Sequence, residues 1–121
     1  MKKKNEISDN FIDLIKIVEK LRDKEEGCLW CNSQTSESIA KYSLEEAKEV
    51  FEAIKEGDNS DICEELGDLL FQVIFHSQIK SEEGKFSIND VIKSINKKMI
   101  RRNPHVFDNQ SNKKYTLREI E

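Results

Sequence analysis

The chain has 121 residues, of which 36% are hydrophobic and 36% are charged, and its formal net charge is −4. The length suffices for one modest hydrophobic core, and the acidic balance excludes the broad basic surface of proteins that bind nucleic acid polymers. No apolar run approaches the ~20 residues of a membrane span, no signal-peptide segment follows Met1, and three cysteines, an odd number, fit a reducing compartment. We therefore expect a cytoplasmic protein that binds neither a membrane nor a nucleic acid polymer.

Apolar residues recur at helical spacing along almost the whole chain, and no stretch alternates with the period of a β-strand. The first helix is predicted over residues 8–22, and a loop is predicted over residues 28–34. The second helix is predicted to begin at Thr35 or Ser36, either of which can cap it, and to end before Gly57.

The third helix is predicted to begin where Asp61 and Glu64 stand at capping-box spacing, and to end near Gly84. Residues 66–75 are apolar nearly all round, so we expect this helix, including Cys63, to be central and buried on most sides. A fourth helix is predicted from the capping pattern at residues 87–90 to a point before Pro104, because the residue preceding a proline disfavours the α conformation.

These elements predict an all-α, bundle-like single domain of four to five helices. The low apolar fraction favours completion of the core by a second copy of the chain, because one copy offers few residues to bury. Residues 108–121 read as a polar tail.

Acidic residues fall on or beside the apolar faces of the second and third helices. At ~100° per residue, Glu46 and Glu49 lie within the apolar arc of the second helix, and Glu45 lies at its polar edge. The third helix carries a narrow polar stripe on an otherwise apolar surface, made of Glu65, Asp68, Gln72 and His76.

Two antiparallel helices joined by a short turn would bring these acidic pairs together. Converging carboxylates repel one another and lose hydration, which is costly unless a cation compensates. Hard oxygen ligands favour Mg²⁺ or Mn²⁺ over zinc. Acidic pairs at this spacing are also common on solvated helix faces, where lysines pair with them, so a purely structural role stays open.

Four segments follow one another in a familiar order: GCLW at 27–30 with QT at 34–35, EEAKE at 45–49, EELGDLLFQVIFH at 64–76, and RRNPHVF at 101–107. They resemble the GCPW…QT, EExxE…ExxD and RRHPHVF motifs of the MazG nucleotide pyrophosphohydrolases. The resemblance covers roughly residues 10–107, and several motifs in one order are far more specific than a single ExxE.

The resemblance implies an all-α pyrophosphohydrolase domain over residues 1–107, with a polar C-terminal tail over residues 108–121, assembled as a homodimer or homotetramer. It implies hydrolysis of ribo- or deoxyribonucleoside triphosphates to a monophosphate and pyrophosphate, with Mg²⁺ (or Mn²⁺) as cofactor, in the removal of aberrant nucleotides. By position it implies four metal ligands, which are Glu46, Glu49, Glu65 and Asp68. Glu45 would be a supporting catalytic carboxylate that orients the attacking water.

Three cations of the expected fourth helix match the family's substrate-binding region. Lys98 and Arg102 match positions that contact the triphosphate, and Arg101 belongs to the same segment. Two cations on one helix face would offset phosphate charge, although cations are also favourable at any helix C-terminus. Trp30 either stacks on the nucleotide base or fills the core from its loop.

Two departures from the family motifs lie outside the proposed ligands. Cys31 and Asn32 stand where the family has an acid and a base after the tryptophan, and Asn103 stands where it has a histidine. They bear on the base or substrate preference rather than on the reaction.

Three other readings compete with the enzyme. Cys28 and Cys31 form a C-x-x-C pair, which is typical of a thiol–disulfide module or half of a zinc site. A non-catalytic nucleotide- or partner-binding helical bundle is another reading. A di-iron bundle is disfavoured because no Glu-x-x-His occurs in the chain.

Overall fold

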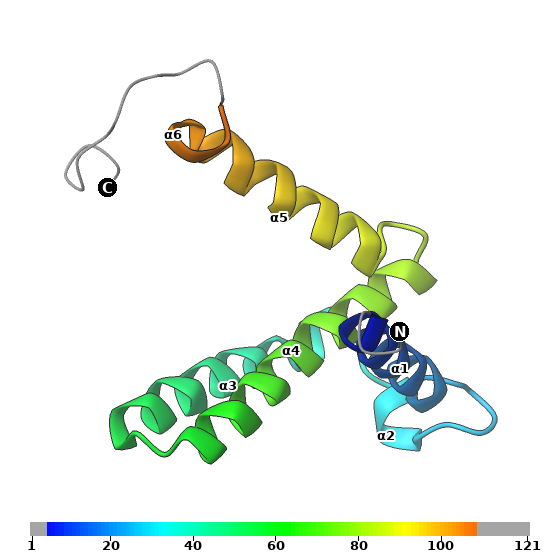
Figure 1. Cartoon of the computed structure of the whole chain (residues 1–121). Coiled ribbons are helices and arrows are strands. Elements are labelled where there is room, and N and C mark those ends of the chain that lie inside the picture. Colours follow the sequence, from blue (N-terminus) through cyan, green and yellow to red (C-terminus); the bar gives the residue numbers. More distant parts are fainter. Residues whose placement is uncertain (1–4, 109–121) are drawn as a thin grey trace. The chain divides into compact units, whose positions relative to one another are not determined.

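A computed structural model describes residues 5–108, so the expected polar tail beyond Asp108 lies outside the described residues. Every regular element in this part of the chain is a helix, which confirms the all-α prediction. The helices in Figure 1 are α1 (Glu6–Leu21), α2 (Leu29–Asn32), α3 (Ser36–Glu56), α4 (Asn59–Glu82), α5 (Ile88–Arg102) and α6 (Pro104–Phe107). Over residues 5–108, none of them is both long and apolar enough to cross a membrane.

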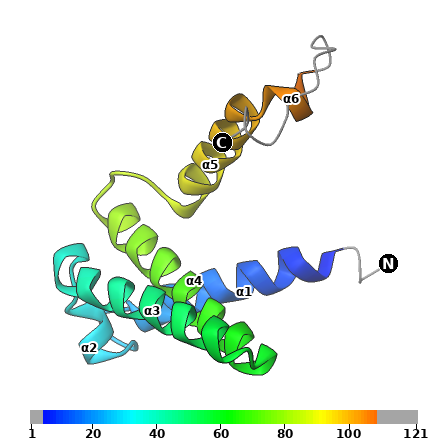
Figure 2. The same ribbon diagram turned by 90° about the vertical axis from the view of Figure 1, so that its left-hand side faces the viewer.

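The chain divides into two compact units, one ending at Phe86 and the other beginning at Ser87. The first unit contains α1 to α4, and α3 and α4 run antiparallel beside each other within it (Figure 1). Helix α1 packs against α4 in the same unit (Figure 2). The second unit contains α5 and α6, which contact each other. The predicted domain limit at residue 107 stays a prediction.

Helix α3 has the two ends that its sequence predicts. The Ser38 backbone N–H donates to the Thr35 hydroxyl at 3.1 Å, and the Thr35 N–H donates to the Ser38 hydroxyl at 2.9 Å. This reciprocal capping box satisfies two amides that the helix itself leaves without acceptors. At the other end Gly57 has φ of 80°, a left-handed conformation that costs little without a Cβ.

Two details of the next elements differ from the prediction. Asp58, and not Asp61, caps α4, because its carboxylate accepts from the N–H groups of Ser60 at 2.9 Å and Asp61 at 3.2 Å. The helix ends at Glu82, just before the predicted Gly84. The predicted loop at residues 28–34 contains the single turn α2, which is too short to show a hydrophobic period.

The core of the first unit is small and lies where α1, α3 and α4 meet. Phe75, Ile39, Ile74 and Val18 are its largest fully buried side chains. Within the first unit, the expectation that α4 is buried on most sides is wrong for one face of the helix. Leu66, Leu70 and Val73 are 49%, 41% and 39% exposed, and Cys63 is exposed. Apolar composition predicts what a helix can bury, but it does not identify a neighbour that covers it.

Arg22 joins the end of α1 to α2 and to the end of α4. Its guanidinium makes two hydrogen bonds to the Glu82 carboxylate, at 2.6 and 3.1 Å, and two to the carbonyl oxygens of Cys31 and Gln34, both at 2.8 Å. It also lies 5.9 Å from the centroid of the Phe75 ring. The side chain is only 9% exposed, so one buried cation fixes the chain between α1 and α3.

Helix α5 of the second unit begins and ends as predicted. The Asp90 carboxylate accepts the Ser87 backbone N–H at 2.9 Å, which caps α5. Helix α5 ends before Pro104, and the side-chain amide Nδ2–H of Asn103 donates to the Met99 carbonyl at 2.7 Å. Pro104 then occupies the first position of the short helix α6, where a missing N–H costs nothing.

Candidate metal and nucleotide site

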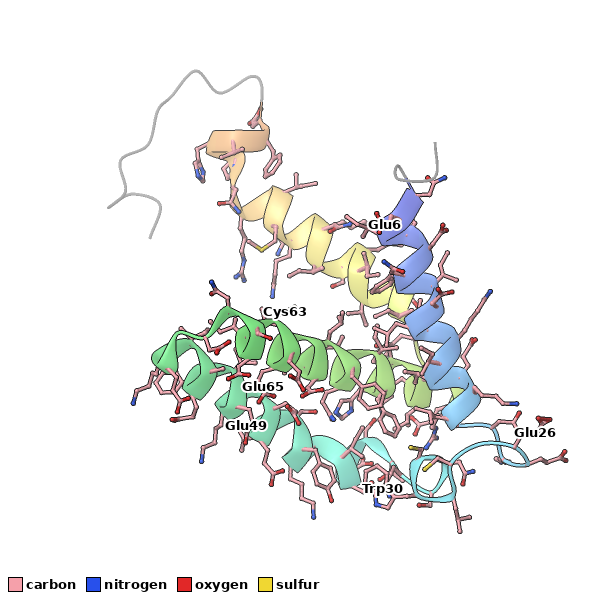
Figure 3. All side chains as sticks on the ribbon, turned by 60° about the horizontal axis from the view of Figure 1, so that its bottom comes forward. Glu6, Glu26, Trp30, Glu49, Cys63 and Glu65 are labelled. Carbon is pink, nitrogen blue, oxygen red and sulfur yellow. The ribbon has the colours of Figure 1, made fainter. Side chains whose placement is uncertain are left out.

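Carboxylates from α3 and α4 converge where the two helices lie side by side. One oxygen each of Glu46, Glu65 and Asp68 lies within 4.8 Å of the other two, and we call these three residues the acidic cluster. Glu46 and Glu65 are half-buried and Asp68 is exposed. In Figure 3, Glu49 and Glu65 project from the neighbouring helices α3 and α4. The i, i+3 pair of α4, Glu65 and Asp68, thus meets one acid of α3, Glu46.

Glu49 and Glu45 stand at the margin of this cluster. Both are exposed, and neither offers an oxygen within the same distance of the other three. Their charges still act on it, since both raise the pKa of Glu46. The predicted role of Glu49 as a metal ligand and that of Glu45 as a supporting carboxylate stay predictions.

The acidic cluster is electrostatically strained without a cation. Burial raises the pKa of Glu46, and the charges of Asp68, Glu49 and Glu45 raise it further. The pKa of Glu65 is raised too, and partial burial is the largest cause. A hydrogen bond with Asp68, which favours protonated Glu65, and the negative charges around it raise this pKa further. The Glu46 Oε2 atom is buried and has no hydrogen-bond partner. A buried carboxylate oxygen without a donor is costly, so this arrangement fits a bound cation.

A second polar group lies beside the acidic cluster between the same helices. The Ser43 hydroxyl on α3 is 3.2 Å from Gln72 Oε1 and 2.9 Å from His76 Nε2, both on α4. Burial lowers the pKa of His76, and the nearby Lys80 charge lowers it further, so the neutral imidazole is favoured. If the hydroxyl donates to Gln72, His76 must donate from Nε2–H. We call Ser43, Gln72 and His76 the polar cluster.

An aromatic surface continues along α3 from these two clusters. Trp30 on α2 meets Tyr42 on α3 edge to face, with ring centroids 5.8 Å apart. Trp30 is 50% exposed, so within this unit it does not fill the core. Tyr42 precedes Glu46 by one helical turn, about 6 Å along the axis. Figure 3 shows Trp30 by the start of α3 and Glu49 and Glu65 farther along the helix pair.

The three cations predicted to bind substrate all lie on α5, in the second unit. Lys98, Arg101 and Arg102 are exposed there, in the last five residues of the helix. Their part in binding the triphosphate stays a prediction.

The sequence did not predict a role for two residues of this region, Ser43 and Arg22. Ser43 lies three residues before Glu46 on the same face of α3, and that spacing is a signal that could have found it. Arg22 holds α2 and hence Trp30, but its partner Glu82 is 60 residues away along the chain. No local pattern predicts such a contact.

Comparisons with known proteins show the family of the chain. A family model described as the MazG nucleotide pyrophosphohydrolase domain matches residues 34–107. A nucleoside triphosphate pyrophosphohydrolase/pyrophosphatase MazG from Thermotoga maritima is 53% identical over 97 residues, which are 80% of this chain and 38% of that protein. A nucleoside triphosphate pyrophosphohydrolase from Escherichia coli is 50% identical over 103 residues, which are 84% of this chain and 39% of that protein.

A solved structure supports the fold as well. The crystal structure of a mazG-related protein from Thermotoga maritima matches with a TM-score of 0.71 and 26% sequence identity, covering 89% of this chain and 90% of that chain. The chain spans about two fifths of the length of the curated relatives it matches.

Proposed function

The chain belongs to the MazG nucleotide pyrophosphohydrolase family, and we propose that it hydrolyses nucleoside triphosphates to a monophosphate and pyrophosphate with Mg²⁺. One observation carries the proposal: the half-buried acidic cluster of Glu46, Glu65 and Asp68, with the Glu46 Oε2 atom left without a donor. The names of the curated relatives give the same reaction class for those longer proteins.

The residues of the acidic cluster fit Mg²⁺ by their chemistry. They offer only carboxylate oxygens, the ligands that Mg²⁺ prefers, and Mn²⁺ accepts the same set. Glu46, Glu65 and Asp68 would hold the ion, and Glu49 would join them by a rotamer change. When bound, the ion supplies positive charge that offsets the charge of the triphosphate and polarises its phosphoryl oxygens.

The rest of the first unit suits the nucleoside. The half-exposed Trp30 ring, held by Tyr42, offers a face on which a base stacks. The polar cluster lies on the same helix pair and offers hydroxyl, amide and imidazole groups for the sugar or the base edge. We propose that Lys98, Arg101 and Arg102 on α5 offset the remaining phosphate charge.

The reaction needs a proton acceptor for the attacking water. Glu45 is exposed beside Glu46 and would take this proton as a general base. Cleavage between the α and β phosphorus atoms releases pyrophosphate as one unit. We propose that the substrates are ribo- or deoxyribonucleoside triphosphates. We also propose that the reaction serves to remove aberrant nucleotides.

The test is a pyrophosphate-release assay with Mg²⁺ over the standard ribo- and deoxyribonucleoside triphosphates, with orthophosphate followed in parallel. We expect pyrophosphate without orthophosphate from the wild-type protein. We expect Glu65→Gln to lower kcat at least about 10-fold, because even the loss of a group that only orients a metal ligand costs about 10–100-fold. The matched control is Glu64→Gln, which removes an exposed carboxylate outside the cluster and should keep kcat.

Two results would contradict the proposal. Equal activity in Glu65→Gln and Glu64→Gln would remove the acidic cluster from the reaction. Nucleotide binding without any turnover, with Mg²⁺ or Mn²⁺ and the fold intact, would favour a binding module instead.

We further propose that the active form is a homodimer or homotetramer.

A further inference from the structure

Two cysteines of the first unit face each other across the turn α2. The Cys28 Sγ atom accepts the backbone N–H of Cys31 at 3.3 Å, and the backbone N–H of Asn32 donates to the Cys28 carbonyl at 2.9 Å. These bonds hold the two side chains on one side of a single helical turn. Both are free thiols; Cys31 belongs to the core cluster with Ile39, Phe75 and Ile79, and Cys28 packs against that cluster.

The two thiols have different surroundings. Cys31 is 8% exposed. Its pKa is raised to about 11, mainly by burial and next by a hydrogen bond with the Cys28 thiol. Cys28 is only half-buried. Its pKa is lowered, mainly by the hydrogen bond from the Cys31 backbone N–H and next by a hydrogen bond with the Cys31 thiol. A partly exposed thiol with a lowered pKa is the more reactive nucleophile, and a buried neighbour can resolve the product.

The described residues give the pair no further metal ligands. Across residues 5–108, the acidic cluster is the one group of three or more side chains placed to share an ion, and it contains no cysteine. A structural zinc site needs four ligands, and two thiols supply only half of them. The geometry therefore favours thiol chemistry.

We propose that Cys28 and Cys31 form a redox-active dithiol, which a small-molecule disulfide such as glutathione disulfide converts to an intramolecular disulfide in the folded protein. The Cys28 thiolate attacks one sulfur of the reagent, whose S–S bond breaks and releases one thiolate. The Cys31 thiolate, after losing its proton to solvent, then attacks the Cys28 sulfur and expels the second. The two protein thiols are oxidised by two electrons, and the reagent is reduced to two thiols.

Arg22 prepares this second step. It donates to the Cys31 carbonyl oxygen at 2.8 Å, and its positive charge opposes the rise in the Cys31 pKa. The resulting disulfide would close a ring that contains Leu29 and Trp30. Trp30 is the only tryptophan of the chain, so its fluorescence reports the reaction directly.

The experiment uses the full chain with Cys63→Ser, which removes the exposed third thiol. The reduced protein is incubated with glutathione disulfide, quenched in acid, alkylated and analysed by mass spectrometry. We expect loss of both alkylation sites without a glutathione adduct, full reversal by dithiothreitol, and a change in Trp30 fluorescence with the same time course.

Variants identify the order of the steps. Cys31→Ser should stop at a glutathione adduct on Cys28, and Cys28→Ser should leave the buried Cys31 unmodified. A native protein that stays fully reduced, or whose cysteines react only in urea, would overturn the proposal. So would a wild-type pair that stops at the mixed disulfide. None of these readouts uses nucleotide turnover, so their failure is distinct from failure of the proposed function.

Discussion

The carboxylates of the acidic cluster oppose folding when no cation is present. The pKa values of Glu46 and Glu65 are raised above the ordinary carboxyl value of 4.5. The folded state therefore holds its protons more tightly than the unfolded state. These two groups favour folding at low pH, and this contribution is lost as pH rises through their folded-state pKa values. At neutral pH the cluster is a site of stored repulsion that a bound cation relieves.

This repulsion predicts opposite effects of one substitution on stability and on metal binding. Glu65→Gln should raise the Tm of the metal-free protein by a few degrees at pH 7, because a charge is removed from the cluster. The same variant should lose the rise in Tm that Mg²⁺ gives the wild-type protein. Thermal unfolding with EDTA or with Mg²⁺ measures both. Glu64→Gln should behave as the wild type, and a metal-free Glu65→Gln protein less stable than wild type would contradict the argument.

His76 predicts a pH dependence on the acid side of neutrality. Its pKa is lowered from 6.5 by burial and by Lys80, so the folded state resists a proton that the unfolded state accepts. Stability should fall as pH drops below about 6.5, until the folded-state pKa is reached. Urea unfolding between pH 5 and 7.5 should show this slope in wild type, and His76→Gln should remove that part of it. An unchanged slope in the variant would assign the dependence to other groups.

At the scale of elements, Arg22 is the residue whose removal should destabilise the first unit most, because it joins α1, α2 and α4. Arg22→Ala leaves Glu82 and two part-buried carbonyl oxygens without their donor, and should lower the free energy of unfolding by about 1–3 kcal/mol, as loss of the donor to buried acceptors does. Lys20→Ala breaks the exposed pair with Glu26 and should cost less than about 1 kcal/mol. Urea denaturation compares the two, and similar losses would contradict the central position of Arg22.

The elements also show what the sequence can and cannot predict. The ends of α3 and α5 were predicted because capping residues, Gly57 and Pro104 act within a few residues. The burial of α4 was predicted wrongly, because its apolar residues reveal nothing about which surface covers them. The convergence of Glu46, Glu65 and Asp68 follows from i, i+3 spacing on antiparallel helices joined by a short turn. Glu49 shares that spacing, yet its exposed position depends on how α3 is rotated, which spacing alone does not fix.

The first unit, taken by itself, leaves more apolar surface uncovered than a stable monomer needs. Seven hydrophobic residues of the described chain are buried, and Leu44, Phe51 and Ile54 on α3 are each more than half exposed. Leu66, Leu70 and Val73 lie at i, i+4 and i+7, so they form one face of α4. Burying a leucine stabilises by about 1.5–3 kcal/mol, so such a face favours association.

We therefore expect a homodimer or homotetramer whose interface includes this face of α4. Leu70→Lys should shift the mass measured by light scattering toward the monomer and lower Tm, because a charge cannot be buried there without a partner. Leu29→Lys is the control, since Leu29 is 84% exposed on α2 and apart from that face. A wild-type protein that is monomeric at micromolar concentration and unfolds cooperatively would contradict the expectation. The small core of one chain, together with Arg22 and the helix caps, would then have to stabilise the monomer without an interface.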